Sequence, residues 1–159
     1  MRGLVYVRNR QGTRRVNTRA LQRIAKRFLA GVSPGGFEVG FYLVGEVEMT
    51  RLNETYLRHK GSTDVITFDY AEPAERQRLK GEIFICVDEA VGQARRFRAS
   101  WQTELLRYLV HGVLHLCGYD DQRASDRRKM KREEDRLVSE LRRHFRVADL
   151  GLPRSRRLP

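Results

Sequence analysis

The spacing of hydrophobic residues changes several times along the chain, and each spacing predicts a different element. Residues 4–8 alternate apolar and polar side chains, which predicts a short strand. Over residues 18–30 the apolar side chains recur at steps of three and four, which predicts an amphipathic helix. Pro34 and the glycines beside it then interrupt the helical pattern. The chain therefore begins as a strand followed by a helix.

The rest of the chain continues this alternation. Residues 37–44 are rich in aromatic and β-branched side chains and predict a strand, and the spacing over residues 47–57 favours a helix. Two further strands are predicted at residues 63–70 and 81–87, followed by helices at residues 88–98, 101–117 and 123–145. The order βαβαββααα predicts an α+β domain, one mixed sheet covered by helices, with a three-layer α/β domain as the alternative.

Length and composition narrow the class of protein. A chain of 159 residues is enough for one domain, predicted over residues 1–150, and residues 151–159 are predicted to be a disordered basic tail. No apolar run reaches the roughly 18 residues of a membrane span, and residues 1–15 lack the apolar centre of a secretory signal. We therefore expect a cytoplasmic protein without a membrane partner. Cys86 and Cys117 are expected to be reduced thiols in the core.

The charge is strongly positive and unevenly distributed. The formal net charge is +12; residues 1–36 hold nine basic and no acidic side chains, and residues 123–159 hold thirteen basic and six acidic ones. The 86 residues between them have a net charge of −4, from ten basic and fourteen acidic side chains. Two basic arms around an acidic centre favour a nucleic-acid partner. The alternative is a cationic surface without a specific ligand.

Residues 111–121, HGVLHLCGYDD, have the spacing of a metal site. His111 and His115 lie four residues apart, so both imidazoles project from one face of the predicted helix. Gly118 is suited to end that helix and turn the chain, which would return the carboxylate of Asp121 to the two rings. Two imidazoles and a carboxylate with an open fourth position predict one catalytic zinc ion per chain, activating a water molecule.

Other interpretations of this motif remain open. The two histidines are also compatible with packing in the core. Asp121 is alternatively the cap of a turn, in which case Asp120 or a water molecule completes the metal shell. The outline matches that of zinc proteases, but Gly112 stands where those enzymes carry a glutamate general base.

Residues 111–121 also resemble the YbeY endoribonuclease signature, H-G-x-L-H-L-x-G-Y-D-H. Two more segments, LNETYLRHKGSTDVITF at residues 52–68 and GEIFICVDEAVGQA at residues 81–94, are similar to family motifs in the same order. The chain departs from the family pattern at two positions. Asp121 replaces a histidine that is the third metal ligand, and Leu57 replaces a basic residue, with Arg58 next to it.

The resemblance implies a zinc-dependent endoribonuclease with a metalloprotease-like fold that prefers single-stranded RNA. It also implies a role in ribosomal RNA maturation and ribosome quality control, with the ribosomal subunit or its associated proteins as partners. Arg58 is then a possible RNA contact, and a solvated loop is the alternative for Arg58 and Lys60. The sequence does not identify the general base or the nucleophile of this cleavage reaction. There are two competing functions. One is a zinc peptidase, and the other is a non-catalytic RNA- or ribosome-binding factor with a structural metal.

Overall fold

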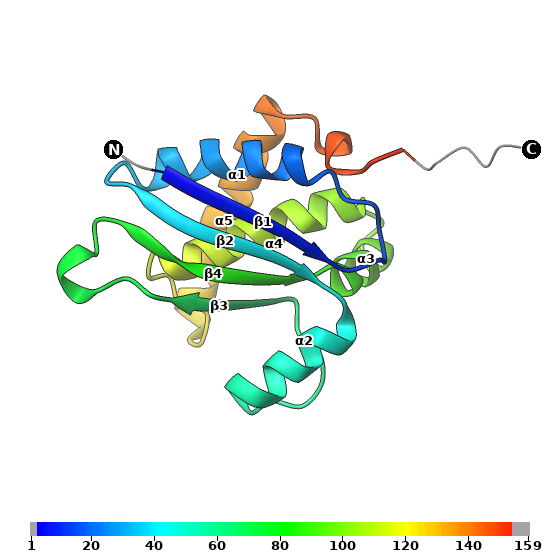
Figure 1. The fold of residues 1–159 in the computed structure, drawn as a ribbon, viewed down its shortest axis with the longest axis horizontal. Coiled ribbons are helices and arrows are strands. Elements are labelled where there is room, and N and C mark those ends of the chain that lie inside the picture. The colour runs from blue at the N-terminus through cyan, green and yellow to red at the C-terminus, as the bar shows by residue number, and fades with distance from the viewer. Residues whose placement is uncertain (1–2, 154–159) are drawn as a thin grey trace, which may run out of the picture.

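A four-stranded mixed sheet organises residues 3–153, the part of the chain that the computed structural model describes (Figure 1). The strands are β1 (Gly3–Arg10), β2 (Phe37–Val44), β3 (Val65–Asp69) and β4 (Leu79–Cys86). The α-helices are α1 (Thr18–Val32), α2 (Glu46–Leu52), α3 (Val87–Arg96), α4 (Trp101–Leu116) and α5 (Ala124–His144). These elements follow the predicted order.

The strands lie in the order β1-β2-β4-β3. β1, β2 and β4 run parallel, whereas β3 pairs antiparallel with β4, so that Val65 faces Ile85. β3 is therefore an edge strand that runs against its neighbour. The predicted single α+β domain with one mixed sheet is confirmed.

Side-chain alternation along the strands divides the apolar residues into two clusters. Phe41 and Ile83 point to the face that α1, α4 and α5 cover, and both are fully buried in the main core. Phe84 points to the opposite face, where Met49 of α2 packs in a smaller cluster. α4 lies against β3 and β4, which places the motif of residues 111–121 beneath the edge of the sheet.

Two local predictions differ from the structure. The second helix ends at Leu52 and continues as a π-helical turn, Asn53–Leu57, after which Arg58 adopts a left-handed conformation (φ 55°). Cys86 is buried as predicted, but Cys117 is exposed, so the expectation of two core thiols is wrong for Cys117. Cys117 follows the last residue of α4, where the chain leaves the core to turn.

The start of the predicted tail contacts the domain. Gly151 forms an antiparallel bridge with Val16, and the Leu152 N–H donates to the Arg15 carbonyl at 2.9 Å. Residues 151 and 152 of the predicted tail thus contact the domain, and residues 154–159 of that tail lie outside the described residues. Within residues 3–153, none of the helices is both long and apolar enough to cross a membrane.

Candidate metal centre

The two histidines of the motif lie side by side on α4. Ser100 caps the start of this helix, and its hydroxyl accepts the Thr103 N–H at 3.1 Å. His111 and His115 are one turn apart on its surface, and their Nε2 atoms are separated by 3.1 Å. Their side chains are 22% and 25% exposed, so both rings are held by packing and still reach solvent.

A tight turn brings the carboxylate to these rings. Gly118 has a φ of +97°, a left-handed conformation that glycine adopts without a steric penalty. After this turn the Oδ2 atom of Asp121 lies 3.6 Å from Nε2 of His111 and 3.4 Å from Nε2 of His115. The carboxylate of Asp120 instead accepts the Gln122 N–H at 3.0 Å. The structure therefore brings Asp121, and not Asp120, to the histidine pair.

The remaining ring nitrogens have partners that determine the tautomers. Nδ1 of His115 lies 3.1 Å from the carbonyl oxygen of Tyr119, and Nδ1 of His111 lies 3.3 Å from Oε2 of Glu134. Both partners are acceptors, so each Nδ1 carries the proton and donates it. Each Nε2 consequently presents a lone pair to the other ring and to Asp121.

This convergence of lone pairs fits a bound cation. Zinc bonds to nitrogen and oxygen ligands are about 2.0–2.1 Å, so ligands of a tetrahedral site lie about 3.3 Å apart. The three candidate ligand atoms are separated by 3.1, 3.4 and 3.6 Å, close to that value. Outer partners that orient the ligating imidazoles are a further property of metal sites. Together, His111, His115 and Asp121 form a cluster with the geometry to hold a metal ion.

Glu134 of α5 gives the site its electrostatic character. Its side chain is only 8% exposed, and Nη1 of Arg107 donates to its Oε1 at 3.2 Å. Burial alone raises the pKa of Glu134, but His111, Lys131 and Arg107 outweigh burial and hold it below its usual range. Burial likewise lowers the pKa of His111, and the hydrogen bond and charge of Glu134, with Asp64 and Asp121, raise it above the ordinary value. The acidic groups around His111 thus stabilise a positive charge at its ring.

Sequence reasoning missed Glu134, although the sequence contained a signal. The inner face of α5 is apolar at Met130, Leu137, Val138 and Leu141, and Glu134 is the charged side chain that interrupts this stripe. A carboxylate at a buried position requires a partner. The carbonyl of Tyr119 carried no comparable signal, because any residue supplies one.

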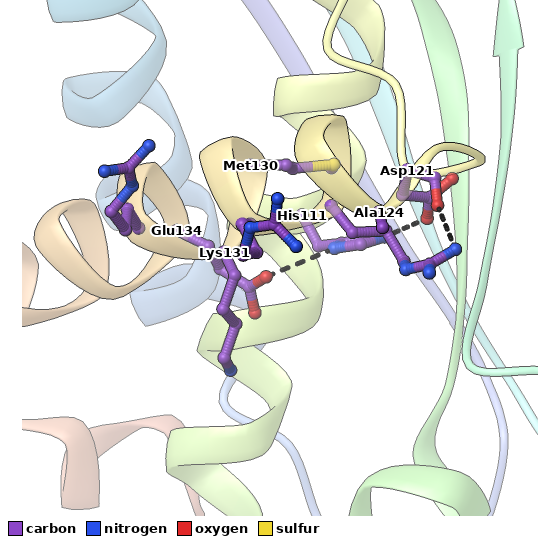
Figure 2. A pocket seen from close by; sticks show the side chains of 9 residues that line it. His111, Asp121, Ala124, Met130, Lys131 and Glu134 are labelled. Carbon is purple, nitrogen blue, oxygen red and sulfur yellow. Dashed lines mark hydrogen bonds and ion pairs between the residues drawn. The ribbon is translucent and has the colours of Figure 1, made fainter.

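A cavity of about 730 Å³ opens beside the cluster, between α4 and the first half of α5. His111, Asp121 and Glu134 line it, together with residues of α5 that include Ala124 and Met130 (Figure 2). Figure 2 shows Glu134 reaching from α5 to His111 on α4. Among the described residues, those that line this cavity do not include Arg58, which lies exposed after the π-helical turn.

Fold and site together define a single-domain α+β protein with a three-residue cluster, suited to a metal ion, at the edge of an open cavity. The family model described as Endoribonuclease YbeY matches residues 6–142. The chain is 38% identical to an Endoribonuclease YbeY of Anaeromyxobacter sp. strain Fw109-5 over 133 residues, 84% of this chain and 67% of that protein. It is 31% identical to the Syntrophotalea carbinolica protein of the same name over 148 residues, 90% and 99% of the two chains.

A solved structure shares the fold. The solution structure of TM1509 from Thermotoga maritima superposes with a TM-score of 0.65 at 25% identity, over 98% of this chain and all of that one. The chain belongs to the YbeY endoribonuclease family.

Proposed function

We propose that this protein is a zinc-dependent endoribonuclease that prefers single-stranded RNA. We further propose that it acts in the cytoplasm in ribosomal RNA maturation and ribosome quality control, with the ribosomal subunit or its associated proteins as partners. Family membership supports the nuclease class. The observation that carries the metal dependence is the convergence of three ligand atoms, 3.1–3.6 Å apart, at the edge of an open cavity.

The residues around the cluster prepare it for phosphodiester chemistry. A zinc ion held there would supply Lewis acidity toward the negative charge that develops on phosphoryl oxygens during cleavage. The Nδ1 atoms of His111 and His115 donate hydrogen bonds to Glu134 and to the Tyr119 carbonyl. These hydrogen bonds fix the two rings, so that the Nε2 lone pairs point into the site. Asp121 contributes a third donor and a negative charge. Three protein ligands would leave a coordination position of the metal open to substrate.

Gly112 argues against the competing peptidase function. A Cβ atom at this position would lie 2.6 Å from Cγ2 of Ile83 on β4, because α4 rests directly on the sheet. A glutamate base of the zinc-protease type has no room here. In the proposed reaction the proton acceptor is another side chain, a second water molecule or the ribose 2′-hydroxyl.

The charge distribution supports an RNA substrate. The two basic arms, residues 1–36 and 123–159, carry net charges of +9 and +7, and the −4 of the residues between them brings the total to +12. Cations of this density attract a phosphate backbone through counterion release. Arg58, exposed after the π-helical turn, is proposed as an additional RNA contact outside the cavity.

Cleavage assays with and without metal test the proposal. We expect the purified protein to cleave single-stranded RNA faster than duplex RNA, to stop after chelation and to recover when zinc is added. His111→Ala and His115→Ala should lose zinc and activity while circular dichroism shows an intact fold. Cleavage of casein instead of RNA would establish the peptidase, and zinc binding without cleavage of either would establish a non-catalytic factor.

A further inference from the structure

One wall of the cavity next to the candidate metal centre is a row of cations on α5. The lining side chains of this wall include Arg127, Arg128, Lys131 and Arg132. Residues 123–132, around the first two turns of α5, contain six basic side chains and one acidic one. Arg128, Lys131 and Arg132 are exposed, so their charged groups are available to a ligand. We call these four cations the α5 wall.

The α5 wall carries like charges at a spacing that opposes helix formation. Arg127 and Lys131 are four residues apart, and so are Arg128 and Arg132. Side chains at this spacing are neighbours on a helix, and like charges there destabilise it. The repulsion is relieved when an anion binds between them.

The second half of the same helix is built differently. Arg136 donates from Nη1 to the carboxylate of Glu140 at 3.4 Å and also pairs with Glu133. Arg136 is therefore compensated by acids at the spacings that stabilise a helix. Arg142 and Arg143 form no ion pair among the described residues, but they lie in the last turn of α5, where cations favour the helix dipole, and they do not line the cavity.

Two members of the α5 wall already have partners. Nη1 of Arg127 donates to the carbonyls of Asp121 at 3.4 Å and Gln122 at 2.9 Å, so this guanidinium supports the turn that carries the candidate ligand. Nζ of Lys131 lies 3.5 Å from Oδ1 of Asp135. Arg128 and Arg132, by contrast, form no ion pair with any residue in the described range 3–153.

The acids of the cavity do not neutralise these two arginines. Asp121 faces the histidine pair, and Glu134 is engaged by His111 and Arg107. A cavity of about 730 Å³ lies within the range of about 300–1,000 Å³ typical of small-ligand sites. It thus offers two free guanidinium groups beside the metal centre, and guanidinium groups bind phosphate oxygens in a bidentate manner.

We propose that Arg128 and Arg132 bind backbone phosphates of the RNA strand that occupies the site, next to the phosphate being cleaved. The strand then follows the first half of α5, with Lys131 adding positive charge between the contacts. This inference rests on the proposed function, because it assigns the path of that function's substrate. Arg128 and Arg132 are positioning residues, since they act on the strand and not on the reacting atoms.

A pair of matched double variants tests the α5 wall. The test variant is Arg128→Gln with Arg132→Gln. The control is Arg95→Gln with Arg96→Gln, which removes two exposed arginines from α3, outside the cavity and outside both basic arms. Binding of a short unstructured single-stranded RNA is measured at several salt concentrations, together with KM, kcat and zinc content. A third variant, Arg128→Lys with Arg132→Lys, keeps the charge and removes the bidentate contact.

The test variant should bind RNA with a salt dependence less steep by about 0.7 in log–log slope for each lost phosphate contact. Its KM should rise more than its kcat falls, and its zinc content should stay at the wild-type level. The lysine variant should keep the wild-type slope with weaker binding, and the control should match wild type.

The outcomes separate this inference from the proposed function. If the protein cleaves RNA but the test and control variants have equal slopes and KM values, the phosphate contacts of Arg128 and Arg132 are wrong and the proposed endoribonuclease activity is unaffected. If the salt dependence of RNA binding is less steep in the test variant than in the control, but the protein never cleaves RNA, the phosphate contacts are supported and the proposed endoribonuclease activity is wrong. Absence of RNA binding by the wild-type protein overturns both.

Discussion

At the scale of single residues, Asp121 is the candidate ligand that the turn after α4 brings to the histidine pair. Its Oδ2 atom lies within 3.6 Å of Nε2 of both histidines. Asp121→Ala should therefore lose most of its zinc, and Asp121→Asn should bind zinc more weakly because the charge is removed. Asp121→His should retain zinc through three imidazoles. Zinc stoichiometry after dialysis measures all three.

Asp120→Ala is the control for this series. Its carboxylate accepts a backbone N–H of Gln122 and does not face the histidines, so this variant should keep its zinc. Zinc retained by Asp121→Ala but lost by Asp120→Ala would reverse the assignment of the third ligand.

Glu134 and its neighbour Glu133 provide a second comparison of single residues. Glu134 accepts from His111 and is buried, whereas Glu133 pairs with Arg136 at the surface. Loss of an outer partner of a metal ligand typically reduces metal affinity by about 10–100-fold. We expect Glu134→Gln to show a reduction of this size in competition titrations with a chelator. Glu133→Gln should bind zinc like wild type, and equal affinities for the two variants would contradict the role of Glu134.

At the scale of elements, the contact between α4 and β4 depends on Gly112. Adding a methyl group there brings it 2.6 Å from Cγ2 of Ile83, and such overpacking costs about 1–3 kcal/mol. Alanine recovers about 1 kcal/mol through its helix propensity. Gly112→Ala should therefore lower the free energy of unfolding in urea, despite the better helix former.

Gly92 of α3 is the matched control, because a Cβ atom there has open space. Gly92→Ala should raise the free energy of unfolding by about 0.5–1 kcal/mol. If both substitutions stabilise the protein, α4 does not rest on β4 as closely as described.

At the scale of the whole molecule, the basic arms should contribute to RNA binding without regard to sequence. Removing residues 154–159 deletes Arg154, Arg156 and Arg157 and keeps the bridge between Gly151 and Val16. We expect weaker binding to unrelated single-stranded RNAs by the same factor, with a smaller salt dependence, because phosphate contacts carry no sequence information. Fluorescence titrations with two RNAs at several salt concentrations measure this effect. A loss confined to one RNA would indicate base recognition instead.

The sequence by itself determined the elements and the local part of the site. His111, His115 and Asp121 lie on one helix and the turn that follows it, so helical spacing and the φ preference of Gly118 were sufficient to bring them together. The mixed sheet also followed from the element order. These features depend on interactions between residues close in the chain, which local periodicity describes.

Only the tertiary structure decided what surrounds the three residues. Glu134 is 23 residues from His111 and reaches it because α5 packs on α4, and the same packing forms the cavity and turns the α5 wall toward it. Packing also placed Cys117 in solvent, against a simple expectation from the sequence. Contacts of this kind depend on how the faces of distant elements fit together, and the spacing of residues within one element does not encode that fit.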